Sequence, residues 1–170
     1  PIFALLALDS RNYLPGSAVR RQCVDAILSA ECSGGGWAFG GSAADPDMTA
    51  MALQALAGYS DEPAAASAIG RALEALSRIQ EKDGAYASFG AVNAESCAQA
   101  VLALGALGVP QDDPRFVKNG ASALDALLRF RLEDGSFSHE MDGKSSPLAT
   151  AQAYAALCAA DGGKLFVPGK

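Results

Sequence analysis

Gln80-Glu81-Lys82-Asp83-Gly84-Ala85-Tyr86 carries a pattern that returns on both sides of it along the chain. Gly36-Trp37 precedes this stretch and Gly135-Ser136-Phe137 follows it, which places the aromatic residues at positions 37, 86 and 137. They are therefore 49 and 51 residues apart, and a period of this length is typical of proteins built from tandem copies of one supersecondary unit.

The residues upstream of each aromatic predict a helix with one polar face. Apolar residues stand thirteen and ten positions before the aromatic, and an acid stands twelve positions before it. The apolar residues are Val24, Ile27, Leu73, Leu76, Leu124 and Leu127, and the acids are Asp25, Glu74 and Asp125. Apolar residues three apart beside an acid are typical of an amphipathic helix. We expect the first of these helices over residues 17–31 and the third over 114–132.

The residues downstream of each aromatic predict a second helix. A side-chain oxygen followed by proline or alanine marks each start, at Asp45-Pro46, Asn93-Ala94 and Ser146-Pro147. The helices that follow carry almost no charge, so we expect them to be buried on all sides. The sequence thus predicts an all-α chain with two layers of helices.

One domain is expected over residues 1–170. An apolar run at residues 2–8 resembles the buried helix of a preceding unit. The repeats are expected at 17–59, 63–108 and 114–160.

Composition excludes several classes of protein. Half of the 170 residues are hydrophobic, so a sizeable core is available. The formal net charge is -6 and there is no run of Lys and Arg, so we expect no nucleic-acid partner and no anionic membrane surface. No apolar stretch is long enough for membrane insertion. Because the chain begins at Pro1 without a signal peptide, we expect an excised segment of a longer protein.

The four cysteines indicate no metal knuckle or redox motif. Cys23, Cys32, Cys97 and Cys158 form no C-x-x-C pair. Cys23 and Cys97 lie in apolar helical patterns and are expected to behave as small buried hydrophobes. A Cys23–Cys32 disulfide in an oxidising compartment is left open by the sequence.

Residues 80–86 resemble the QW repeat of terpenoid cyclases and of protein prenyltransferase β subunits. Residues 130–137 and 31–37 are looser copies, with Arg131 and Glu31 where Gln80 has the signature glutamine. The resemblance implies an α/α toroid, of which this chain would form an open arc of about three helical hairpins and one leading helix. The rest of a parent chain or a second copy would then complete the ring.

The stretch Asp45-Pro46-Asp47-Met48-Thr49-Ala50 resembles the D-x-D-D-T-A motif of class II terpene cyclases. The resemblance implies Asp47 as a catalytic general acid, with Asp45 as the neighbour that raises its pKa. Met48 replaces the other expected acid. The alternative is structural: Asp45 caps a helix and Asp47 favours the helix dipole, as Asn93 and Glu95 would in the next repeat. We favour this second interpretation.

A zinc site is a further alternative that the resemblance to prenyltransferases implies. Glu95-Ser96-Cys97 stands at the place of their D-x-C motif, and His139 is the only histidine. His139 follows Phe137 in a loop rather than on a second helix, so no metal and no cofactor are expected.

A ligand site is expected where the second helices begin. Their starts should gather one group of polar residues: Asp45, Asp47, Asn93, Glu95, Ser146 and Thr150. Five aromatics lie in or beside the loops: Trp37, Phe39, Tyr86, Phe89 and Phe137. We expect the aromatics to hold the loops against neighbouring helices, and the rival is that they contact an apolar ligand, with Trp37, Tyr86 and Phe137 as the candidate contacts.

The resulting hypothesis is a non-catalytic binding or surface module that takes a small apolar molecule or a corrinoid. Residues 93–99 and 113–120 resemble stretches of bacterial surface proteins, which implies an extracellular or cell-surface location, with the cytoplasm as the alternative. The rival functions are a cyclase-type enzyme that uses Asp47 and, less favoured, a prenyltransferase-like zinc enzyme.

Overall fold

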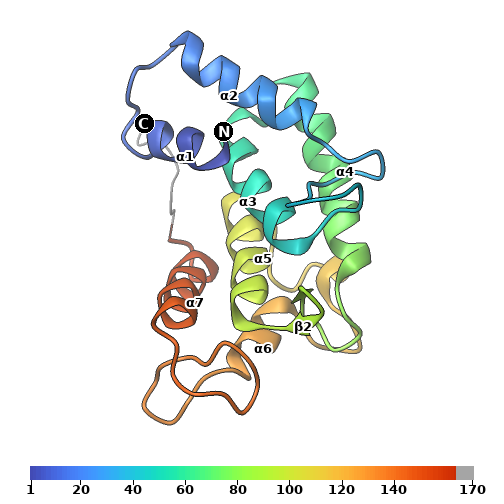
Figure 1. Cartoon of the computed structure of the whole chain (residues 1–170), viewed down its shortest axis with the longest axis vertical. Helices are drawn as coiled ribbons and strands as arrows, with labels where there is room; N and C mark the ends of the chain where they lie inside the picture. The colour runs from blue at the N-terminus through green and yellow to red at the C-terminus, as the bar shows by residue number, and fades with distance from the viewer. Residues whose placement is uncertain (164–170) are drawn as a thin grey trace.

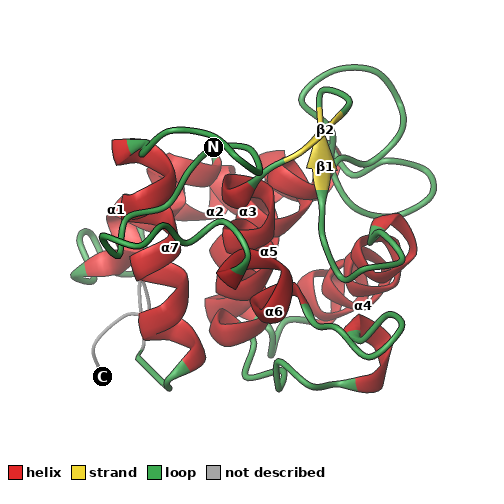
Figure 2. Ribbon diagram, turned by 90° about the horizontal axis from the view of Figure 1, so that it is seen from below, coloured by secondary structure: helices red, strands yellow, loops and turns green. Residues whose placement is uncertain are grey.

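The computed structural model describes residues 1–163 and is mostly helical, as the sequence predicts (Figure 1). The α-helices are α1 (Ile2–Ser10), α2 (Ala18–Ser29), α3 (Pro46–Leu56), α4 (Pro63–Ile79), α5 (Ala94–Ala106), α6 (Ala123–Leu128) and α7 (Pro147–Ala160). Two 3-10 turns, η1 (Ala57–Tyr59) and η2 (Pro114–Phe116), and two strands, β1 (Ala87–Ser88) and β2 (Ala91–Val92), complete the regular structure of the described residues. The strands pair antiparallel as a small hairpin beside the start of α5 (Figure 2).

Four helices form an inner row. In it α3 packs between α1 and α5, and α5 packs between α3 and α7. The other three helices form an outer layer, in which α2 packs on α1, α4 on α3, and α6 on α5. Within the described residues, no helix combines the length and the apolar character needed to cross a membrane.

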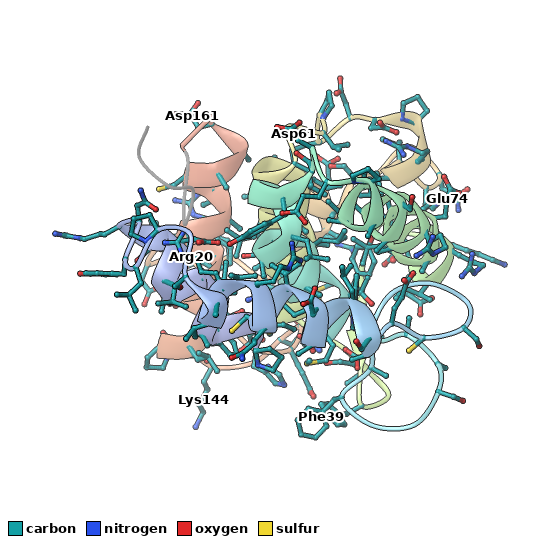
Figure 3. All side chains as sticks on the ribbon, turned by 90° about the horizontal axis from the view of Figure 1, so that it is seen from above. Arg20, Phe39, Asp61, Glu74, Lys144 and Asp161 are labelled. Atoms are coloured by element: carbon teal, nitrogen blue, oxygen red, sulfur yellow. The ribbon has the colours of Figure 1, made fainter. Side chains whose placement is uncertain are left out.

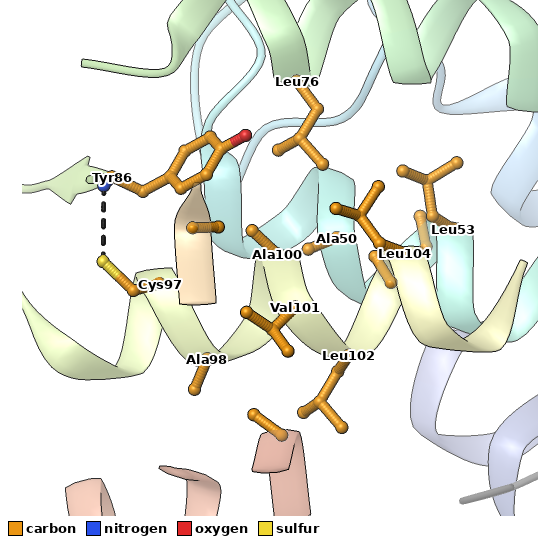
Figure 4. Close-up of a cluster of buried hydrophobic side chains, with 14 of the residues drawn as sticks. Ala50, Leu53, Leu76, Tyr86, Cys97, Ala98, Ala100, Val101, Leu102 and Leu104 are labelled. Atoms are coloured by element: carbon orange, nitrogen blue, oxygen red, sulfur yellow. Dashed lines mark hydrogen bonds between the residues drawn. The ribbon is translucent and has the colours of Figure 1, made fainter. Parts of the chain in front are cut away.

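The three loops before α3, α5 and α7 share one hydrogen-bond pattern. The backbone N–H of the residue that caps each inner helix donates to the carbonyl of the loop aromatic: Asp45 to Trp37 (2.9 Å), Asn93 to Tyr86 (3.3 Å) and Ser146 to Phe137 (2.8 Å). The N–H of the same aromatic donates to a side chain in the first turn or just beyond it: Trp37 to Thr49 (3.0 Å), Tyr86 to Cys97 (3.4 Å; Figure 4) and Phe137 to Thr150 (2.9 Å). Each loop is thus fixed at two points to the helix that it precedes.

The predicted helix caps are confirmed. Side-chain oxygens of Asp45, Asn93 and Ser146 accept hydrogen bonds from backbone N–H groups three residues ahead, at 2.8, 2.8 and 3.2 Å. Such caps satisfy the free N–H groups of a first turn, and each contributes about 1 kcal/mol. All four cysteines are free thiols in the structure.

Two predictions about helices were wrong in part. The third outer helix does not run over 114–132: η2 ends at Phe116, Asn119-Gly120 turns the chain between bridged Lys118 and Ala121, and α6 covers only six residues. Both turn residues have positive φ, +49° and +83°, which a helix does not allow. Helix α7 is not buried on all sides either, because Leu148 and Tyr154 are exposed on the edge of the inner row.

The loop aromatics contribute to the core between the layers. Trp37, Tyr86 and Phe137 are 2%, 0% and 1% exposed. The indole Nε1 of Trp37 donates to the carbonyl of Ile27 at 2.7 Å, which ties the loop to α2. The hydroxyl of Tyr86, in contrast, is buried without a hydrogen-bond partner among the described residues.

Replacing Tyr86 by phenylalanine is therefore expected to raise the free energy of unfolding by about 1 kcal/mol, since an unpaired buried hydroxyl costs that much or more. Chemical denaturation followed by circular dichroism measures the change. A loss of stability in Tyr86→Phe would contradict the burial of an unpaired hydroxyl.

Candidate ligand-binding site

Three adjoining cavities open along the inner row. The first, of about 390 Å³, lies among α1, α3, α5 and α7, and its lining includes Phe3, Gln54 and Leu102. The second, of about 440 Å³, lies where α3, α5 and α7 begin. The third, of about 550 Å³, lies beside the start of α3 and the β1–β2 hairpin. Met51 lines all three cavities, which therefore adjoin at this side chain, and we call the three together the trough.

Carboxylates gather at the end of the trough where α3 and α5 begin. Asp47 borders the second and third cavities, Glu95 the second, and Asp45 the third. Asp45 is fully engaged: one carboxylate oxygen accepts from the N–H of Met48 at 2.8 Å and the other from the N–H of Phe39 at 2.6 Å. Asp45 thus caps α3 and at the same time holds the backbone of Phe39 at the rim.

Asp47 is the least satisfied of these carboxylates. Burial raises its pKa above the usual aspartate value, and the neighbouring charges of Asp45 and Glu95 raise it further, while the hydroxyls of Ser96 and Ser88 oppose the shift. Oδ1 of Asp47 is buried and accepts no hydrogen bond in the described structure, so the two serine hydroxyls offset only part of the cost of burial. Asp47 therefore keeps a proton to higher pH than an exposed aspartate does.

This raised pKa has a consequence for stability. The folded protein binds the Asp47 proton more tightly than the unfolded chain does, so stability should fall as pH rises above the unfolded pKa near 3.8, until the folded carboxyl is fully ionised. Asp47→Asn should lack this component. Urea denaturation of both proteins between pH 3 and 7 measures the difference. Parallel pH profiles for the two proteins would show that the pKa of Asp47 is not raised.

The only histidine ties the third unit to the start of α5. Nδ1 of His139 lies 2.7 Å from Oε2 of Glu95, and the backbone N–H of Ala94 donates to the His139 carbonyl at 3.0 Å. The His139 side chain is about half exposed and borders the second cavity. The loop after Phe137 thus forms one wall of the trough.

A row of glutamines runs across the inner helices. Nε2 of Gln54 on α3 donates to Oε1 of Gln99 on α5 at 2.8 Å, and Nε2 of Gln99 donates to Oε1 of Gln152 on α7 at 2.9 Å. All three side chains border the first cavity. The first cavity therefore has a polar strip in mostly apolar walls, and hydrogen bonds between neighbouring amides position the three side chains.

The structure brings together most of the polar residues predicted for this end. Asp45, Asp47, Asn93, Glu95 and Ser146 all border the second or third cavity. Thr150 does not, because its hydroxyl is bonded to the backbone of Phe137.

The five aromatics divide between the two roles considered for them, and the three candidate ligand contacts are not at the cavities. Trp37, Tyr86 and Phe137 are buried in the core and border none of the three cavities. Phe39 and Phe89 were expected to hold the loops, yet they are 79% and 93% exposed and line the third cavity. Figure 3 shows Phe39 projecting from the periphery of the molecule.

The described residues include no cluster of side chains that could form the zinc site considered as an alternative. Within residues 1–163, no group of three His, Cys, Asp or Glu side chains lies close enough to hold a metal ion. The Cys97 thiol is buried against the N–H of Tyr86, and burial raises its pKa to about 11.

Comparisons with known proteins assign this chain to no family. Neither a scan against protein-family models nor a search of curated proteins gave a match to this chain.

Proposed function

We propose that the trough binds an elongated, largely apolar small molecule without converting it. The observation that carries this proposal is the position of Met51, which borders all three cavities and so makes them a single site. Small-molecule sites are mostly apolar clefts with a few placed polar groups, and the glutamine row and Asp47 supply such groups here.

Exposed apolar side chains around the trough support the same function. Phe3, Phe39, Phe89 and Leu148 are between 61% and 93% exposed, and each lines one of the cavities. A patch of this kind on a soluble domain marks an interaction site, because covering apolar surface contributes about 25 cal/mol per Å². The adjoining cavities, of about 390 to 550 Å³ each, suit a slim molecule that extends from one into the next better than a corrinoid, which is a bulky, amide-rich macrocycle.

The wider architecture supports a binding module. An inner row of helices covered by outer helices is compatible with the α/α toroid that the QW-like repeats imply, and in this proposal α1 is the leading helix of the arc. In this proposal the chain supplies one arc of a ring, completed by a parent chain or a second copy, in a surface protein.

A neutral apolar fluorophore tests the proposed function. N-phenyl-1-naphthylamine should bind the protein with increased emission, and Met51→Trp should weaken binding at least about tenfold because the indole fills the centre of the trough. Met141→Trp is the matched control, since Met141 is exposed and borders none of the three cavities. Absence of binding, or equal loss in both variants, would refute the proposal.

Acid catalysis at Asp47 is a second candidate, favoured by one observation: a carboxyl with raised pKa and an unpaired oxygen borders an apolar cavity. A protonated carboxyl in that position could donate its proton to an alkene. Turnover of a polyprenyl substrate that disappears in Asp47→Asn would support this function. Asp45→Asn, which keeps a capping side chain, should retain the fold, and no turnover by the wild-type protein would eliminate the candidate.

A further inference from the structure

Three phenylalanines from separate segments surround the third cavity. Phe3 lies on α1, Phe39 on the loop before α3, and Phe89 at the tip of the β1–β2 hairpin. They are 70%, 79% and 93% exposed, so none of them is there to fill the core. The rings of Phe39 and Phe89 meet edge to face with centroids 6.4 Å apart. Met48 and Met51 add polarisable thioethers to the wall.

The position of Phe89 is unfavourable for the fold itself. Phe89 and Gly90 form the two-residue turn between the strands, with φ of +51° and +86°. Such a turn favours asparagine or glycine at its first position, and a bulky side chain there is strained. The contact with Phe39 offsets only part of this cost, so the ring has a role other than stabilising the hairpin.

The charge of the same cavity is negative. Asp45 and Asp47 are the only ionisable residues among those that line it, and no Lys, Arg or His of the described residues is among them. The hydrogen bonds of Asp45 hold Phe39 in place, and the buried oxygen of Asp47 has no partner. The cavity therefore combines three aromatic rings with two carboxyl groups and, among the described residues, no basic side chain.

We propose that this cavity is an aromatic cage for a quaternary or methylated ammonium group. The proposal rests on the proposed function of the trough and specifies its ligand: an apolar molecule with a cationic head. Ring faces attract a cation through their quadrupole, and N-methyl groups lose little by leaving water, because they donate no strong hydrogen bonds. The carboxylates add long-range attraction, while an anionic head group would be repelled. The tail would then extend past Met51 into the other two cavities.

Choline and its neutral isostere 3,3-dimethylbutan-1-ol test the cage, because they match in shape and differ in charge. Binding measured by NMR titration of the whole chain should be at least about tenfold tighter for choline. Phe89→Asn should weaken choline binding at least about tenfold while leaving the melting temperature unchanged or higher, since asparagine suits the turn.

Leu14→Asn is the matched control, because Leu14 is also exposed with a positive φ of +48° and lines none of the three cavities. It should leave choline binding unchanged. Equal affinity for choline and the alcohol, or unchanged choline binding in Phe89→Asn, would overturn the cage. If N-phenyl-1-naphthylamine still binds the wild-type protein, the proposed function survives that result; if it does not bind either, both fail.

Discussion

Gly84→Ala is expected to lower the free energy of unfolding by about 3 kcal/mol or more, because two costs combine at this position. Its φ is +84°, where an L side chain is strained. A Cβ would also lie 2.6 Å from the carbonyl oxygen of Ser122 and 2.7 Å from that of Ala121, in the backbone that leads into α6. The loop of the second unit thus touches the outer backbone of the third, and the contact leaves no room for a methyl group. Chemical denaturation measures the loss.

Gly135→Ala separates the two costs. Gly135 occupies the same place in the third loop, with φ of +87°, but the nearest atom to a Cβ would be the Tyr154 hydroxyl at 3.7 Å. Only the backbone strain applies, so the loss should be about 1–2 kcal/mol. Gly35, whose Cβ would meet the Arg71 carbonyl of α4 at 2.7 Å, should behave like Gly84. Equal losses in Gly84→Ala and Gly135→Ala would show that the contact between units is not tight.

Trp37→Ala is expected to cost about 4 kcal/mol or more, since truncating a buried aromatic typically costs 3–5 kcal/mol and the indole hydrogen bond to Ile27 is lost as well. Trp37→Phe keeps most of the packing and loses mainly that bond, so it should cost about 1–2 kcal/mol. Trp37 is the only tryptophan, so wild-type unfolding can be followed by its fluorescence and both variants by circular dichroism. A loss under about 2 kcal/mol for Trp37→Ala would contradict its role in joining the loop to α2.

Sequence predicted the features that depend on near neighbours in the chain. The caps at Asp45, Asn93 and Ser146 follow from a side-chain oxygen placed just before a helix, and the structure has all three. The helix expected over residues 114–132 is interrupted where the sequence has a local turn signal. Asn119-Gly120 is a strong turn pair, and the apolar periodicity that predicted the helix continues on both sides of it.

Sequence could not predict the walls of the trough, because they depend on how four helices converge. Phe3 and Met51 are separated by 48 positions and meet only once α1 packs on α3. Phe89 was expected to hold its loop against the helices, as the other loop aromatics were. Its exposure depends on the small hairpin, which had no alternating pattern to reveal it.

The glutamine row also limits how the inner helices can slide. Gln54, Gln99 and Gln152 lie side by side on three different helices. Gln54 donates to Gln99 and Gln99 donates to Gln152, so both amide hydrogen bonds run in the same direction, from α3 to α5 to α7. The surrounding contacts are largely between alanine and leucine side chains, which tolerate a shift of one turn far better than paired amides do. Slipping α5 by one turn against its neighbours would break both amide bonds at once, so three polar side chains set the alignment of an otherwise smooth apolar interface.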